Sequence, residues 1–161
     1  MLRFEAMSDQ DFAAYIRKAV PEYAYDQMHA GNWSAETAAG RARAEFQQML
    51  PNGPQTPNQH LKVILDGQGY KIGMLWYFVD ASQAPAKAFL IDFFLFPESR
   101  RKGFEAEALA LFEQDARQNG ALRVELQVFA HKSDEISFYQ ASGYGQTSVF
   151  LAKNLDAPEE K

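Results

Sequence analysis

One segment constrains the fold of this chain more than any other: residues 88–96 form a continuous apolar run that only Asp92 interrupts. A strand with one face in water alternates apolar and polar residues, whereas a strand covered on both faces is apolar throughout. Pro97 ends the run, because proline lacks the N–H that a central strand donates. The run therefore predicts a central β-strand between two layers of structure, in a mixed α/β (α+β) domain.

The spacing of apolar residues predicts further strands and helices on both sides of this run. Pro21 is expected to end the first helix or to start the second. Extended segments are predicted at residues 2–7, 61–65, 70–79, 88–96, 122–129 and 147–153, and helices at residues 8–20, 22–30, 34–50, 104–118 and 133–143. The order of these elements indicates a single domain over residues 1–155 and a polar C-terminal tail at residues 156–161.

Charge and hydropathy limit the partners and the location of the protein. The net charge of −5 disfavours nucleic acid as a partner and favours a cation such as an amine. No apolar run approaches the roughly 18–20 residues of a membrane helix, and residues 1–5 do not resemble a signal peptide. We therefore expect a cytoplasmic protein that binds neither nucleic acid nor a membrane.

The residue types also exclude several kinds of site. The chain has no cysteine, which removes disulfides, thiolate metal sites and a cysteine nucleophile. The three histidines, His29, His60 and His131, lie far apart in the sequence and match no metal-ligand spacing. No metal centre is therefore expected.

The turn after the central strand is basic, with Arg100, Arg101 and Lys102 followed by Gly103 and a predicted helix. A helix N-terminus exposes unpaired N–H groups and binds phosphate readily, and Gly103 lets a ligand approach the backbone. From the residues alone, the turn is either an anion site or an ordinary helix start with solvated basic residues. Its spacing matches neither a Walker A loop nor the dinucleotide-binding glycine pattern.

Two segments resemble the GNAT family of N-acetyltransferases. Residues 95–105, Leu-Phe-Pro-Glu-Ser-Arg-Arg-Lys-Gly-Phe-Glu, are similar to the acetyl-CoA loop of that family, which has the form Arg/Gln-x-x-Gly-x-Gly/Ala. Glu105 departs from this form, because the family has glycine or alanine there. Residues 138–144, Phe-Tyr-Gln-Ala-Ser-Gly-Tyr, resemble the family's Tyr-x-x-x-Gly-Phe/Tyr helix end. Lys132 stands where the family commonly has asparagine.

The resemblance implies a GNAT-like fold, with a central twisted mixed sheet of about six to seven strands flanked by helices. It implies acetyl-CoA as co-substrate and direct transfer of the acetyl group, in a ternary complex, to an amine of a small molecule or peptide. It further implies that Tyr139 protonates the departing thiolate and that the Leu95 N–H polarises the thioester carbonyl. The cofactor-binding residues that it implies are Phe94, Leu95, Phe96, Arg100, Arg101, Lys102, Gly103, Phe104, Glu105, Ala106, Lys132 and Tyr139.

Several questions stay open from the sequence. Asp92 and Glu125 are candidate bases for the amine, or structural and solvated carboxylates. Four aromatic residues are candidate liners of an acceptor pocket between the first helices and the sheet, or plain core packing: Tyr23, Trp33, Trp76 and Tyr77. A non-catalytic CoA-binding sensor and a structural domain without a nucleotide are the alternative functions, and a homodimer is left open.

Overall fold

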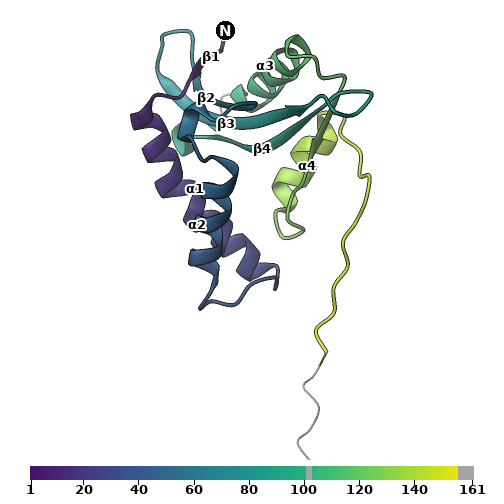
Figure 1. Ribbon diagram of the computed structural model, residues 1–161. Helices are drawn as coiled ribbons and strands as arrows, with labels where there is room; N and C mark the ends of the chain where they lie inside the picture. The colour runs from purple at the N-terminus through teal and green to yellow at the C-terminus, as the bar shows by residue number, and fades with distance from the viewer. Residues whose placement is uncertain (101–102, 156–161) are drawn as a thin grey trace, which may run out of the picture.

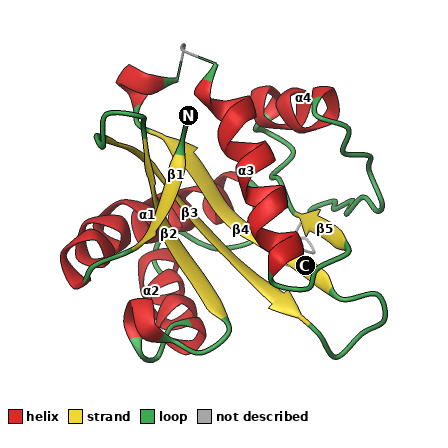
Figure 2. Cartoon of the chain, turned by 90° about the horizontal axis from the view of Figure 1, so that it is seen from above, coloured by secondary structure: helices red, strands yellow, loops and turns green. Residues whose placement is uncertain are grey.

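The computed structural model describes residues 1–100 and 103–155, which form a five-stranded sheet with helices on both faces (Figures 1 and 2). The strands are β1 (Arg3–Ala6), β2 (Gln59–Leu65), β3 (Lys71–Asp80), β4 (Lys87–Leu95) and β5 (Arg123–Leu126), and the helices are α1 (Asp9–His29), α2 (Ala38–Met49), α3 (Phe104–Gln118) and α4 (Ser133–Ala141). The strands lie in chain order, antiparallel except for the parallel pair β4–β5. This confirms the mixed sheet.

Helix α1 is one continuous helix, which makes the predicted break at Pro21 wrong. Ser8 begins it as expected, because the Ser8 Oγ accepts from the Asp11 N–H and the Asp11 carboxylate accepts from the Ser8 N–H. Pro21 removes one backbone hydrogen bond, but the flanking residues Val20 and Ala24 are buried against α2. Tertiary packing therefore holds the helix together through the proline. Among the described residues, no helix is both long and apolar enough to cross a membrane.

The sheet has five strands, fewer than the six to seven expected. Residues 147–153, predicted as the last strand, form no strand in the structure. They leave the body of the molecule as an extended segment, and a strand forms only where a neighbouring strand pairs with it (Figure 1). Strand β5 is also shorter than the alternating pattern of residues 122–129 predicts. Residues 156–161, the predicted tail, lie outside the described residues.

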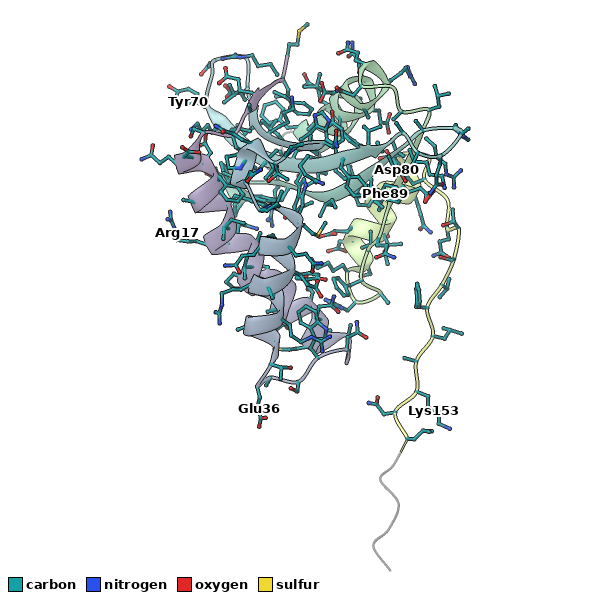
Figure 3. The ribbon with its side chains drawn as sticks, in the orientation of Figure 1. Arg17, Glu36, Tyr70, Asp80, Phe89 and Lys153 are labelled. Carbon is teal, nitrogen blue, oxygen red and sulfur yellow. The ribbon has the colours of Figure 1, made fainter. Side chains whose placement is uncertain are left out.

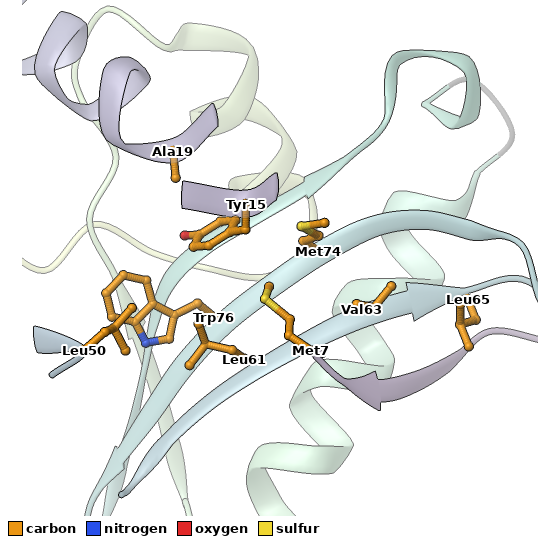
Figure 4. Close-up of a cluster of buried hydrophobic side chains, with 9 residues drawn as sticks. All are labelled: Met7, Tyr15, Ala19, Leu50, Leu61, Val63, Leu65, Met74 and Trp76. Atoms are coloured by element: carbon orange, nitrogen blue, oxygen red, sulfur yellow. The ribbon is translucent and has the colours of Figure 1, made fainter. Parts of the chain in front are cut away.

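Two layers of apolar side chains fix the helices to the sheet. On one face, Tyr15 of α1 packs with Trp76 of β3 and its neighbours (Figure 4). On the other face, Tyr77 of β3 packs with Phe112 of α3. Both β3 residues are almost fully buried: Trp76 donates to Gln59 at 2.7 Å and Tyr77 to Asp115 at 2.6 Å. Trp76 and Tyr77 were candidates for either an acceptor pocket or core packing, and the structure shows that they pack in the core.

The continuity of α1 through Pro21 leads to a stability prediction. Replacing Pro21 by alanine restores a backbone donor at an exposed helix position. The free energy of unfolding is therefore expected to rise by about 1–2 kcal/mol, as measured by urea denaturation. Pro57→Ala, in an exposed loop, is the control and is expected to give no such gain. An unchanged or lower stability of Pro21→Ala would contradict the prediction.

Candidate functional site

The site is defined by the way β4 loses one of its two neighbours. Strand β4 pairs with β3 as far as Leu95, but its parallel pairing with β5 stops at Leu90. The β3–β4 register skips Ile91, so this residue forms a bulge at the place where the β5 pairing ends. Over residues 91–95, the edge of β4 that faced β5 is therefore open among the described residues.

The backbone of Leu95 faces this open edge. The Phe96 N–H donates to the Ile72 carbonyl of β3 at 2.8 Å, and successive backbone groups along a strand point in opposite directions. The Leu95 N–H therefore points away from β3. Phe94 is directed toward β3, opposite Met74. Of the three strand residues predicted to bind the cofactor through the backbone, only Leu95 presents its N–H to the opening.

The side chain of Arg100 binds the backbone of Leu95. Its Nε donates to the Leu95 carbonyl at 3.0 Å. The sequence predicted Arg100 as a cofactor contact, and in the structure its side chain also fixes the end of β4. The Phe96 carbonyl in turn accepts from the Ser99 N–H at 2.8 Å. The turn after β4 is thus held against the strand at two points.

Gly73 gives Leu95 the room that it needs on the neighbouring strand. Gly73 lies opposite Leu95 in the β3–β4 register. A Cβ at this position would collide with the Phe94 carbonyl oxygen and would lie 2.7 Å from the Leu95 Cδ2. The sequence analysis did not select Gly73, although an isolated glycine inside a strand pattern signals such a close approach.

Asp92 projects from β4 on the side of α1. Its carboxylate accepts a hydrogen bond from the Tyr15 hydroxyl at 2.8 Å. Burial raises the pKa of Asp92, and the Tyr15 hydrogen bond and the positive charge of Lys18 offset only part of that rise. Lys18 itself lies 3.8 Å above the Phe94 ring and pairs with Glu22 at 2.7 Å. A carboxylate with a raised pKa is a stronger base than one in water, so Asp92 remains a candidate for the base.

Glu125, the other candidate base, has a different environment. Lys87 and Arg123 pair with its carboxylate at 2.9 and 3.2 Å. The hydrogen bond from Lys87, followed by that from Arg123, lowers the pKa of Glu125. A carboxylate with a lowered pKa is a weak base, so the structural role of Glu125 is the one that the geometry supports.

Tyr139 lies in α4 and is only 9% exposed. Burial, followed by the negative charges of Glu135 and Asp92, raises the pKa of Tyr139 well above its ordinary value. Its hydroxyl therefore keeps its proton at neutral pH, and its role as a proton donor stays a prediction. Within residues 1–100 and 103–155, no hydrogen bond engages this hydroxyl.

Lys132 is held by Asp26, a buried residue of α1. The two side chains pair at 2.8 Å, and Asp26 also lies 3.0 Å from His131. Burial favours a lower pKa for Lys132, but the bond to Asp26 and the charge of Glu135 raise it overall. This pairing joins α1 to the start of α4, and the contact of Lys132 with a cofactor stays a prediction. The sequence analysis missed Asp26 and Tyr15, because no local pattern predicts partners this far apart.

The turn before α3 contains the remaining predicted residues. Gly103 has a left-handed backbone with φ of 72°, which favours glycine and fits its selection from the sequence. Phe104 packs against the core, and Glu105 and Ala106 lie in the first turn of α3. Arg101 and Lys102 lie outside the described residues, so the structure adds nothing to their prediction.

The remaining pocket predictions lie apart from β4. Tyr23 is half-buried, donates to Glu45 at 2.7 Å and packs edge-on against Trp33, at the end of the α1–α2 pair. Their role as acceptor contacts stays a prediction. Two shallow surface hollows lie elsewhere, one between β1 and α3 and one at the ends of β2 and β3. Neither is lined by a predicted site residue, so the open edge of β4 defines the site.

Comparison with known proteins identifies the family. Residues 23–144 match the model of the acetyltransferase (GNAT) family. The chain belongs to the GNAT family. Two relatives come from Bacillus subtilis, both uncharacterized N-acetyltransferases. YdgE is 31% identical over 94% of this chain and 96% of its own length. YycN is 32% identical over 92% of this chain and 96% of its own length. The crystal structure of YycN matches with a TM-score of 0.92 at 30% identity, covering 98% of this chain and 100% of that one.

The described residues fit the acetyl-CoA that the GNAT family implies, with one exception. A strand edge with an outward-facing N–H at Leu95 and a helix that starts at a left-handed glycine suit a thioester arm and phosphates. The exception is Glu105, which adds a negative charge to the helix N-terminus. The neighbouring Glu107 is directed elsewhere, because it accepts from the Leu2 N–H at 2.7 Å.

Glu105 therefore yields a prediction on affinity. Glu105→Ala removes a charge that repels the phosphates, and acetyl-CoA is expected to bind about 2- to 5-fold more tightly, equivalent to about 0.5–1 kcal/mol. Isothermal titration calorimetry at low salt measures this change. Glu107→Ala, which removes the same charge from a carboxylate aimed at Leu2, is expected to change the affinity less. Weaker binding by Glu105→Ala would show that this carboxylate helps to hold the ligand.

Proposed function

We propose that this chain is an acetyl-CoA-dependent N-acetyltransferase that moves an acetyl group to a primary amine of a small molecule or peptide by direct transfer. One observation carries this proposal: over residues 91–95 the edge of β4 is open and presents an outward-facing N–H at Leu95, and the same stretch carries Asp92, a carboxylate with a raised pKa. Tyr139 of α4 is the proposed proton donor. Family membership supports the same reaction class.

Each of the three groups has a distinct role in the proposal. The Leu95 N–H stabilises the negative charge that develops on the thioester carbonyl oxygen, a contribution of about 3–4 kcal/mol for one such donor. Arg100 keeps this backbone in place through the Leu95 carbonyl. Asp92 takes a proton from the acceptor ammonium, which frees the nitrogen lone pair. As the C–N bond forms and the C–S bond breaks, Tyr139 gives its proton to the leaving thiolate, and the resulting phenolate takes up the second proton that the new amide nitrogen loses.

The charges around Asp92 support a cationic acceptor. The negative charge of Glu22 on α1 contributes to the raised pKa of Asp92, and that of Glu135 on α4 contributes to the raised pKa of Tyr139. An amine arrives as an ammonium ion, and carboxylates near the reaction centre favour its approach. Lys18 and Lys132 are each paired with a carboxylate, at 2.7 and 2.8 Å, so they do not leave unbalanced positive charges there.

Loss of the proton donor tests the mechanism. Tyr139→Phe is expected to lower turnover by about 100- to 10,000-fold while acetyl-CoA affinity is retained. Free-thiol release is measured with a panel of amines that includes polyamines, aminoglycosides, amino acids and peptides. Tyr144→Phe, an adjacent tyrosine that bonds to Glu113 instead, is the control and is expected to keep most of the activity. Unchanged turnover in Tyr139→Phe would remove this residue from the mechanism.

The Tyr15–Asp92 hydrogen bond predicts a pH effect. The Tyr15 hydroxyl stabilises the charged form of Asp92, so its loss in Tyr15→Phe raises the pKa of Asp92 further. The acid limb of the pH profile of kcat/KM is then expected to move to higher pH, because Asp92 stays protonated over a wider range. Tyr23→Phe, which removes a bond to Glu45 instead, is the control. A limb that stays in place would show that Asp92 is not the base.

A non-catalytic acyl-CoA-binding sensor is the second candidate. It is favoured by Glu105 in the first turn of α3 and by the ion pair that occupies Lys132. The two candidates differ in one experiment with two measurements. Both predict that saturating acetyl-CoA stabilises the fold, by about 2.7 kcal/mol at 100 times its dissociation constant. Only the enzyme releases free thiol when amines are added, and no stabilisation at all would contradict both.

A further inference from the structure

The sheet ends at an uncovered edge. Strand β5 is the last strand in the order, and only its inner side pairs with β4. The alternating pattern of residues 122–129 continues past the four residues that form β5, and Leu122 at its start is 77% exposed. An edge strand of this kind presents unpaired N–H and C=O groups to any further strand.

The C-terminal arm, defined as residues 145–155, is a strand-like segment without a neighbour. Phe150 and Leu151 are 89% and 92% exposed, and Val149 and Leu155 are also largely in water. Within the described part of the chain, no hydrogen bond or ion pair joins the arm to another residue. The arm runs away from the sheet, and Lys153 on it lies far from the helices and strands (Figure 3). Adjacent apolar residues at this exposure indicate a missing contact.

The arm has a fixed starting point. The Tyr144 N–H donates to the Tyr139 carbonyl at 3.0 Å, and the Tyr144 hydroxyl donates to Glu113 of α3 at 2.9 Å. Gly143, with φ of 96°, ends α4 just before this anchor. At about 3.3 Å per residue, the arm spans roughly 35 Å when extended, more than twice the length of β5. The chain therefore carries the arm well beyond its own body.

We infer that the arm of one copy pairs with the outer edge of β5 in a second copy, and that the exchange is reciprocal. Each copy has one unpaired strand segment and one unpaired sheet edge, so a two-fold dimer satisfies both in a closed arrangement. The exchange supplies the sixth strand that residues 147–153 predict. It also covers the side chains of Val149, Phe150 and Leu151 and gives the remainder of residues 122–129 a neighbour. A second copy fits better than the same copy, because the arm runs away from the helices and strands of its own chain (Figure 1) and, among the described residues, no hydrogen bond joins it to β5.

Sedimentation equilibrium of the full chain tests this inference. The wild type is expected to have twice the chain mass, and the double variant Phe150→Asp/Leu151→Asp a single chain mass, because paired strands exclude unpaired charges. Gln146→Asp/Asn154→Asp, which adds the same charge at the two ends of the arm, is the control and is expected to stay dimeric. A monomeric wild type, or a charged-arm variant that remains a dimer, overturns the proposal.

Cysteine cross-linking separates exchange from the other arrangements and does not depend on a folded double variant. The chain has no cysteine of its own, so every disulfide formed by Leu122→Cys on the edge and Val149→Cys on the arm involves only these introduced residues. When the two single variants are mixed under mild oxidation, a covalent dimer of one copy of each is expected. A disulfide within one chain of the combined variant shows that the arm folds back on its own β5 edge. Cross-linking of Val149→Cys with itself alone shows arm-to-arm pairing, and either result overturns the inference.

Discussion

The end of pairing between β4 and β5 is the constraint on which the site depends. While two strands remain hydrogen-bonded, their backbone groups satisfy each other and are closed to a ligand. The bulge at Ile91 and the divergence after Leu90 open one edge of β4, while β3 still holds the other edge. The Leu95 N–H is thus rigidly placed and still available. Gly73 and Arg100 fix its position from the neighbouring strand and from the following turn.

A half-buried carboxylate, Asp92, connects this edge to α1. Removing Asp92 from water disfavours its charged form, and the hydrogen bond from Tyr15 restores part of the lost stabilisation. Asp26 and Lys132 join α1 to α4 by the same principle, a buried charge that is paired. Because both pairs involve α1, the first helix positions Asp92, the proposed proton acceptor, and also the helix that carries Tyr139. Changes in α1 are therefore expected to affect the proposed reaction centre.

The candidate site was only partly predictable. The basic turn, Gly103 and Tyr139 stand in short motifs that resemble those of the GNAT family, so this resemblance selected them. Tyr15 and Asp26 carry no such signal, because they act through partners that are 77 and 105 or more residues away in the sequence. Trp76 and Tyr77 are adjacent in the sequence but face opposite sides of the sheet, so their aromatic character did not distinguish core packing from a pocket.

Local patterns determined the type and order of the elements, since apolar periodicity, capping residues and glycines act within a few residues. They were sufficient for the central strand, the hairpin of β2 and β3, and the helix that begins after Gly103. Tertiary structure decided what depends on distant partners: that α1 continues through Pro21, that Asp92 is paired with Tyr15, and that residues 147–153 have no strand partner within residues 1–100 and 103–155. A strand needs a neighbouring strand and a buried charge needs a partner. The fold brings these partners from distant parts of the sequence, so adjacent residues do not reveal them.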